Sequence, residues 1–136
     1  MSNSAELSAT QVGAYLVKGT IGNVGLPGAP VAYFSLVVVP GAHSVSGVVE
    51  IKQSVTPPGG NITVQVTGAV RATGYGKVTQ IVALQGQYSV PFPPPAIGEL
   101  EQKFTAHLAI DGAWNGTGGF TYGGQSVENV PVTKLA

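Results

Sequence analysis

The sequence predicts an all-β, single-domain fold, an antiparallel meander of about eight strands that closes into an up-and-down barrel. Runs that alternate apolar and polar residues recur along the 136 residues, short turns rich in glycine and proline separate them, and no segment has the period of a long helix. Closure is favoured over a two-sheet β-sandwich, the alternative, because only 9% of the residues carry charges that could protect a sheet edge.

The first elements follow a polar start. Residues 1–8 are expected to form a flexible N-terminus, and residues 9–136 the single all-β domain. Alternation predicts a first strand from Thr10 to Thr20 and a loop rich in glycine and proline from Ile21 to Ala29. Pro30 then begins the second strand, where a missing backbone N–H is tolerated.

The second strand, residues 31–39, is apolar on both faces. A two-residue loop at Gly41 and Ala42 would place Phe34 opposite Val49 on the third strand. The inward residues predicted for that third strand are Val45, Gly47, Val49 and Ile51.

The outer stripe of the second strand consists of Tyr33, Val37 and Val39. Leaving such side chains in water forgoes about 1.5 to 3 kcal/mol each. We therefore expect a second subunit or another partner to cover this stripe, with the Pro-rich segment 91–98 as the alternative cover. A formal net charge of zero removes the repulsion between copies, so a homo-oligomer is expected.

The hairpin from Asn61 to Tyr88 shows the clearest alternation. If residues 74–76 form a three-residue loop, Val66 opposes Leu84. Ala72 then opposes Val78. The inward stripes of its two strands are Ile62, Val64, Val66, Gly68, Val70 and Ala72, and Val78, Gln80, Val82 and Leu84.

The C-terminal part begins with the Pro-rich segment 91–98, which cannot form a regular ladder and is expected to cover the barrel or cross over it. Alternation returns in residues 103–110, and Asp111-Gly112 predicts a two-residue hairpin turn. The next strand covers residues 113–122. In the last strand, residues 125–133, Pro131 indicates an edge or a bulge.

Candidate ligand-binding residues lie mainly on the strand predicted for residues 113–122. Trp114, Phe120 and Tyr122 share one face with gaps at Gly116 and Gly118, which suits a sugar or an apolar ligand. The competing interpretation is that these rings pack over strand glycines in the core.

Two polar residues extend this candidate site. The predicted turn places His107 near Trp114 and Gly116. Gln80 is predicted to point inward, where it needs a hydrogen-bond partner or a water molecule and would mark a small cavity.

The sequence gives little indication of metal binding, cofactor binding, catalysis or nucleic-acid binding. The chain has no cysteine, and its two histidines lack metal-ligand spacing, so no metal site and no cofactor are expected. No catalytic residue is predicted, because no nucleophile has an adjacent base, and Glu99, Glu101 and Asp111 fit solvated loop charges. The six basic residues are scattered singly, which argues against nucleic-acid binding.

The compartment is predicted to be the cytoplasm. The N-terminal residues lack a basic segment followed by an apolar one, although signal-independent secretion stays open. The longest apolar run, Leu36 to Val39, is far shorter than the ~20 residues of a membrane-spanning helix.

Repeated hairpins such as Ser46–Ile51 and Leu108–Trp114 give the chain a resemblance to small helix-free bacterial proteins grouped as domains of unknown function. By strand count it also looks like lipocalin, avidin and allene-oxide-cyclase-type barrels. We interpret the chain as a non-enzymatic, self-associating structural or interaction module. The alternatives are a barrel that binds a small molecule or carbohydrate and, third, a cofactor-free enzyme.

Overall fold

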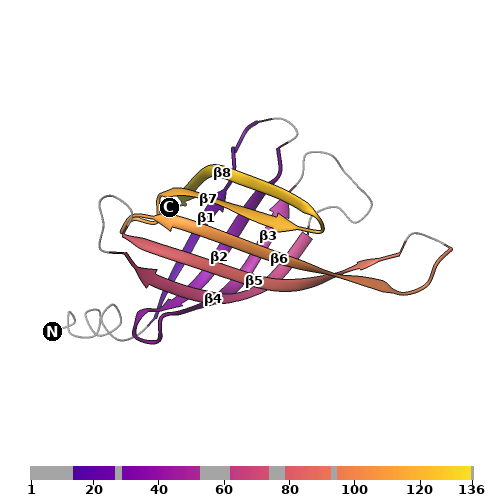
Figure 1. Cartoon of the computed structure of the whole chain (residues 1–136), viewed down its shortest axis with the longest axis horizontal. Coiled ribbons are helices and arrows are strands. Elements are labelled where there is room, and N and C mark those ends of the chain that lie inside the picture. The colour runs from indigo at the N-terminus through magenta and orange to yellow at the C-terminus, as the bar shows by residue number, and fades with distance from the viewer. Residues whose placement is uncertain (1–13, 27–28, 53–61, 74–78, 93–94, 136) are drawn as a thin grey trace.

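A computed structural model describes residues 14–26, 29–52, 62–73, 79–92 and 95–135. These residues form a closed antiparallel barrel in the order β1 to β8, with one short 3-10 turn, η1 (Pro40–Ala42), between β2 and β3 (Figure 1). The predicted all-β meander and its closure are confirmed. The strands are β1 Tyr15–Ile21, β2 Val31–Val39, β3 Ser44–Lys52, β4 Ile62–Ala72, β5 Gln80–Pro91, β6 Glu99–Ile110, β7 Gly116–Tyr122 and β8 Gln125–Lys134.

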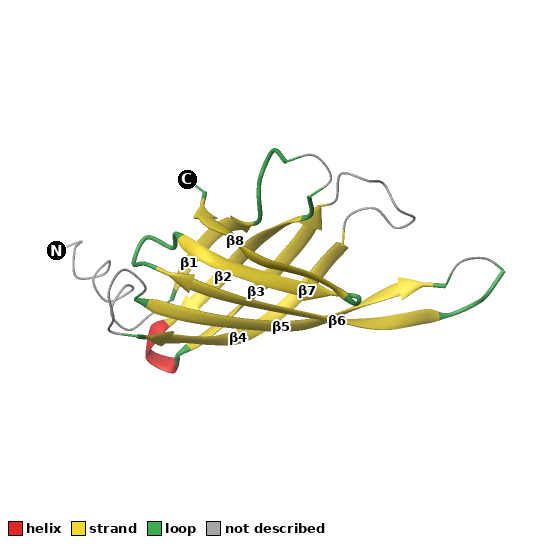
Figure 2. Cartoon of the chain, turned by 45° about the horizontal axis from the view of Figure 1, so that its top comes forward, coloured by secondary structure: helices red, strands yellow, loops and turns green. Residues whose placement is uncertain are grey.

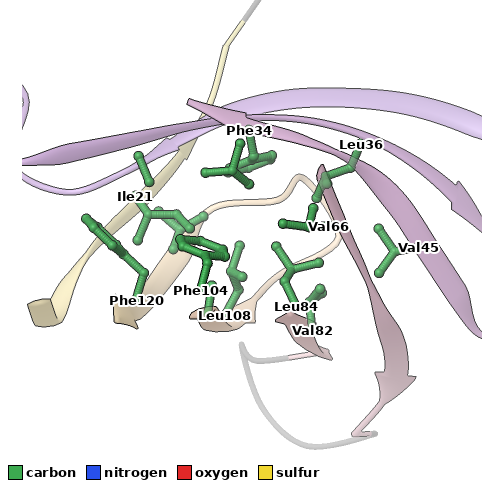
Figure 3. Close-up of a cluster of buried hydrophobic side chains, with 14 of the residues drawn as sticks. Ile21, Phe34, Leu36, Val45, Val66, Val82, Leu84, Phe104, Leu108 and Phe120 are labelled. Atoms are coloured by element: carbon green, nitrogen blue, oxygen red, sulfur yellow. The ribbon is translucent and has the colours of Figure 1, made fainter. Parts of the chain in front are cut away.

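Side chains from all eight strands fill the barrel. They sit at alternate positions because successive residues of a strand point to opposite faces. The predicted inward residues Val45, Val49, Val82 and Leu84 are all buried. The side chains that Figure 3 labels come from most strands: Ile21, Phe34, Leu36, Val45, Val66, Val82, Leu84, Phe104, Leu108 and Phe120.

The β1–β8 ladder closes the barrel. Gly19 pairs with Lys134 and Ile21 with Val132. Ile21 is fully buried, so placing it in a loop was wrong, and β1 extends one residue past the predicted end. The predicted start of this strand, residues 10–13, and the predicted flexible segment 1–8 lie outside the described residues.

The β2–β3 register is the predicted one, with Phe34 opposite Val49. The turn differs, because η1 is followed by His43 in the left-handed region with φ 52°. The His43 amide donates to the carbonyl oxygen of Pro40 at 3.1 Å. Residues 40–43 have the same midpoint as the predicted loop at 41–42, so the register is preserved.

The β4–β5 register was predicted wrongly by two residues. Val66 pairs with Gly86 and Ala72 with Gln80, and the amide of Thr73 donates to the carbonyl oxygen of Thr79 at 2.9 Å. The connection therefore spans residues 74–78 rather than 74–76, and Val78 lies outside the described residues. A shift of two residues keeps every side chain on its predicted face, because the side-chain period is two.

The β6–β7 turn is also longer than predicted. Ile110 pairs with Gly116, so five residues connect the strands instead of two. One side-chain oxygen of Asp111 accepts hydrogen bonds from the amides of Ala113 at 2.8 Å and Asn115 at 3.0 Å. Trp114 lies in this turn with φ 63°, not in the strand.

A bulge in β8 explains the spacing of its apolar residues. Gly118 pairs with Val130 but Phe120 pairs with Val127, and Asn129 between them has φ 56°. The extra residue turns Val127 and Val130 toward the same side although they are three apart. Pro131 was predicted to mark either an edge strand or a bulge. A bulge is present, and it lies just before Pro131 in the sequence. The prediction of an edge strand was wrong, because β8 pairs with both β7 and β1.

The hairpin of β5 and β6 extends beyond the barrel (Figures 1 and 2). β4 pairs with β5 only as far as Gln87, and β7 pairs with β6 only from Phe104 onward. Among the described residues, 88–91 therefore pair only with 99–102. We call these residues, with the described tip residues 92 and 95–98, the arm. The Pro-rich segment predicted as a cover or crossover is the tip of this hairpin, closed by a bond from the Phe92 amide to the Gly98 carbonyl oxygen at 3.0 Å.

Candidate functional site

The three aromatic residues predicted to bind a ligand are buried inside the barrel. Phe120 stacks with Tyr122 and Phe104, with ring centres 5.8 and 6.3 Å apart. Trp114 packs against a different ring, with its ring centre 6.0 Å from that of Phe34. These rings therefore fill the core instead of forming a binding surface.

The other two predicted ligand residues lie on opposite sides of the barrel wall. His107 pairs with Gly119 on the outer face, so its predicted placement beside Trp114 and Gly116 was wrong. Its Nε2 lies 3.3 Å from Oε2 of Glu128, and the two side chains are 59% and 50% exposed. Gln80 points inward as predicted, and its buried Oε1 has no hydrogen-bond partner among the described residues.

Two tyrosines mark the base of the arm. The Tyr122 hydroxyl donates to Oε1 of Gln125 at 3.3 Å. Burial raises the pKa of Tyr88 above its ordinary value of 10.0, and electrostatic interaction with Tyr122 raises it further. Burial also raises the pKa of Tyr122. Both phenols therefore stay neutral at physiological pH and serve as hydrogen-bonding and packing groups there.

The outer face of β1–β3 carries exposed aliphatic side chains. Leu16 pairs directly with Val37, and Val48 pairs with Ser35, two residues along the strand from Val37. Leu16 is 62% exposed, Val37 40% and Val48 39%. We call Leu16, Val37 and Val48 the apolar patch. Leu16 and Val37 are therefore direct cross-strand neighbours, and Val48 lies diagonal to Val37 on the same face of the sheet.

Tyr33 and Val39, the other predicted interface residues, border this patch and are half-buried. Nζ of Lys52 lies 4.6 Å from the centre of the Tyr33 ring and 3.8 Å from a carboxylate oxygen of Glu50. Part of the Tyr33 ring is therefore covered within the chain itself. The sequence did not identify Leu16 and Val48 as members of this exposed surface. Leu16 can be identified from its pairing with Val37, and that pairing is known only once the β1–β2 register is known.

Comparison with protein families gives a match over most of the chain. The family described as Domain of unknown function (DUF1842) matches residues 12–127. The chain belongs to the DUF1842 family. A comparison with curated proteins found no match. The expected resemblance to a domain of unknown function is thus confirmed.

The outer face of the DUF1842 barrel also has a polar groove over β4–β6, with a volume of about 420 Å³. Thr67 pairs with Gln85, and Gln85 pairs with Thr105. Amide and hydroxyl groups from neighbouring strands therefore form a row of hydrogen-bonding groups across it. The residues that line the groove are Gln65, Thr67, Gln85, Gly86, Gln87, Lys103, Phe104 and Thr105.

The described residues contain no group of three or more histidine, aspartate or glutamate side chains placed to hold a metal ion. Within the same residues, no helix has the length and apolar character required to cross a bilayer.

The arm of the DUF1842 barrel carries a second group of exposed apolar side chains. Leu100 is 48% exposed, Phe92 40% and Ile97 97%. Glu99 and Glu101, which alternate with Leu100, are exposed as well. The candidate functional surfaces are therefore three, the apolar patch, the polar groove and the arm, and all lie on the outside of the barrel.

Proposed function

We propose that this DUF1842 barrel is a non-enzymatic, self-associating module with a structural or protein-interaction role, and that a second copy covers the apolar patch. The observation that carries this proposal is the exposed pair of Leu16 and Val37, with exposed Val48 diagonal to Val37 on the same outer face of β1–β3. Contiguous exposed apolar side chains mark interaction sites, whereas single ones are normal. The filled interior supports a function on the outer surface (Figure 3).

The apolar patch is too small to form a stable interface between two copies by itself. Full burial of a leucine or valine side chain contributes about 1.5 to 3 kcal/mol, and these three are already partly covered. A stable interface buries about 800 Å² per partner, which three side chains do not provide. The interface must therefore extend to bordering residues, and we place Tyr33 and Val39 among them.

Sedimentation velocity tests self-association. The wild-type chain is expected to form oligomers, and Leu16→Ser combined with Val37→Ser is expected to shift it toward the mass of one chain. The matched control is Ile81→Ser, because Ile81 is 41% exposed on the outer face of β5, away from the patch. A wild-type chain of single-chain mass at all concentrations, or a patch variant that sediments like the control, would reject the proposal.

A second candidate function is carbohydrate binding in the polar groove over β4–β6. The specific observation is the row of Thr67, Gln85 and Thr105, whose amide and hydroxyl groups match the hydroxyl groups of a sugar. This moves the proposed ligand site from the interior residues to the outer face, where His107 follows Thr105 by two positions.

Thermal unfolding with a panel of mono- and disaccharides tests this second candidate. A sugar at 100 times its dissociation constant adds about 2.7 kcal/mol to the free energy of unfolding. Gln85→Ala is expected to abolish that shift, while Gln125→Ala, outside this groove, retains it. No shift with any sugar would remove this candidate. For the compartment we propose a bacterial cytoplasm, since a chain without cysteine forms no disulfide, and disulfides are typical of oxidising compartments.

A further inference from the structure

A row of hydroxyl and amide side chains crosses the strands from β4 to β8 at one level. Its members are direct cross-strand partners, which point to the same face of a sheet. In strand order they are Thr67, Gln85, Thr105, Thr121 and Ser126. We call these residues the polar track. Thr121 is half-buried and the others are exposed, so the track lies on the outer face of the barrel.

The five strands that carry the polar track form one layer of the barrel. Figures 1 and 2 show β4 to β8 side by side, and β1 and β2 pass behind them in Figure 1. Neighbouring strands are about 4.8 Å apart, so the track is about 19 Å long from β4 to β8. A single sugar ring covers only part of this length, whereas a chain of several sugar units covers all of it.

Three adjoining hollows follow the polar track. The polar groove over β4–β6 is the first. A second hollow of about 360 Å³ shares Thr67 and Gln85 with the groove and lies over Ala69 and Ala83, whose small side chains leave this space. A third hollow of about 540 Å³ is lined by the track residues of β7 and β8, and it shares Lys103 with the groove. The surface is therefore hollowed along the whole track.

The groups along the polar track suit a ligand that is uncharged and rich in hydroxyl groups. Hydroxyl and amide groups both donate and accept hydrogen bonds. The hydroxyls of Thr105 and Thr121 hydrogen-bond to each other, and this pair still has one O–H donor and acceptor sites on both oxygens. Among the described residues that line the three hollows, Lys103 is the one cation, and Glu101 lies in the same hollow. A sulfated or phosphorylated chain would need more positive charge.

The direction of the polar track argues against an extended peptide as its ligand. An extended peptide that adds to a sheet pairs with an unpaired strand edge. From β4 to β7, each track residue already has a paired strand on both sides. A chain that crosses these strands therefore binds through side chains, as an oligosaccharide does.

We infer that the polar track binds a linear, uncharged oligosaccharide that lies across β4 to β8. This inference rests on the second candidate function, carbohydrate binding in the polar groove, and extends that site to β7 and β8. The aromatic rings of Trp114, Phe120 and Tyr122 are buried, so the contacts are hydrogen bonds. Binding strength should then accumulate along the chain, because each net hydrogen bond contributes little.

Isothermal titration calorimetry with cello-, chito- and malto-oligosaccharides of one to six units tests this dependence on length. In the series that binds, the dissociation constant is expected to fall about two- to tenfold with each added unit, which corresponds to about one net hydrogen bond. The decrease should stop once the chain is longer than the track. A sulfated heparin hexasaccharide is the contrasting ligand, and tighter binding of this anionic chain would overturn the inference.

A variant of the β7–β8 end separates the polar track from the polar groove. Thr121→Val with Ser126→Ala is expected to weaken hexasaccharide binding about tenfold and to leave disaccharide binding unchanged, since the groove over β4–β6 stays intact. Gln85→Ala is expected to weaken both. Thr117→Val is the matched control, because Thr117 is exposed on the outer face of β7 but does not line any of the three hollows. Circular dichroism verifies that every variant keeps the β-sheet fold.

The outcomes separate the inference from the second candidate function. If the disaccharide binds as tightly as the hexasaccharide, the inference is rejected and carbohydrate binding in the groove stands. The same holds if the β7–β8 variant binds the hexasaccharide as well as the Thr117→Val control does. If no oligosaccharide of any length binds, both the inference and the second candidate function are rejected.

Discussion

The indole Nε1 of Trp114 donates a hydrogen bond to the hydroxyl oxygen of Tyr15 at 3.1 Å. This bond joins two residues that are 99 positions apart and ties the β6–β7 turn to the start of β1. Trp114 reaches the interior because its turn adopts φ 63° and is held by the side chain of Asp111. One aromatic side chain thus connects the end of the barrel to its core.

Tyr15→Phe is expected to lower the free energy of unfolding by about 1 to 2 kcal/mol, because it leaves the buried indole N–H without this acceptor. Trp114 is the only tryptophan in the sequence, so its fluorescence follows this site directly during urea unfolding. The matched control is Tyr33→Phe on the outer face of β2, with an expected change below about 0.5 kcal/mol. Equal stability of Tyr15→Phe and the wild type would contradict the prediction.

Gly68→Ala is expected to destabilise the protein by about 2 to 3 kcal/mol, because overpacking moves the backbone. A Cβ at Gly68 would lie 1.8 Å from the carbonyl oxygen of Ala83 on β5. Gly112→Ala is the control, since a Cβ at Gly112 meets nothing within 4 Å. Chemical denaturation of the two variants gives the comparison, and similar stabilities would show that β4 and β5 are not packed this closely.

The β8 bulge makes Asn129 sensitive to side-chain shape. Asn129 has φ 56°, a region that asparagine and glycine tolerate and that β-branched residues avoid. Asn129→Val is expected to cost about 1 to 2 kcal/mol, whereas Asn129→Gly retains wild-type stability within about 0.5 kcal/mol. Thermal unfolding measures both, and an unchanged melting temperature for Asn129→Val would place the bulge elsewhere.

Stability is expected to fall at alkaline pH through Tyr88 and Tyr122. Their folded pKa values are raised above 10.0 by burial, so the folded state holds these protons more tightly than the unfolded chain. The associated stability is complete below pH 10.0 and is lost as pH rises from there through the folded pKa values. Urea midpoints measured against pH should therefore decline above pH 10 in the wild type.

The double variant Tyr88→Phe with Tyr122→Phe isolates this alkaline effect. It removes both phenols, so its midpoints should decline less steeply above pH 10 than those of the wild type. Between pH 7 and 9 the two proteins should show parallel profiles, since neither phenol ionises there. An alkaline slope that is the same in both proteins would assign the loss of stability to other groups.

Much of the fold follows from local pattern. The alternation around Val49, Val64 and Val82 predicted which side chains face inward, and all three are buried. The same pattern could not find the β4–β5 register. A shift of two residues preserves the faces, so the pattern is equally satisfied by Val66 opposite Leu84 and by Val66 opposite Gly86.

The candidate site was less accessible to sequence reasoning. Trp114 and Tyr122 fit both a binding surface and a core by composition, and only the closed barrel shows them buried. The apolar patch was found in part through Val37, but Leu16 joins it only through the β1–β2 register. The arm was hidden because its Pro-rich tip resembles a loop, while its length depends on where the neighbouring strands separate.

By itself, the sequence determined that this DUF1842 chain is all-β, that its strands alternate between core and solvent, and that its second strand is apolar on both faces. These are local properties, set by the period of the side chains along a single strand. Only the tertiary structure decided the turn lengths, the closure through β1 and β8, and the extension of β5 and β6 beyond their neighbours. Those features arise from pairing between distant segments, whose hydrogen bonds and packing are summed over the whole barrel.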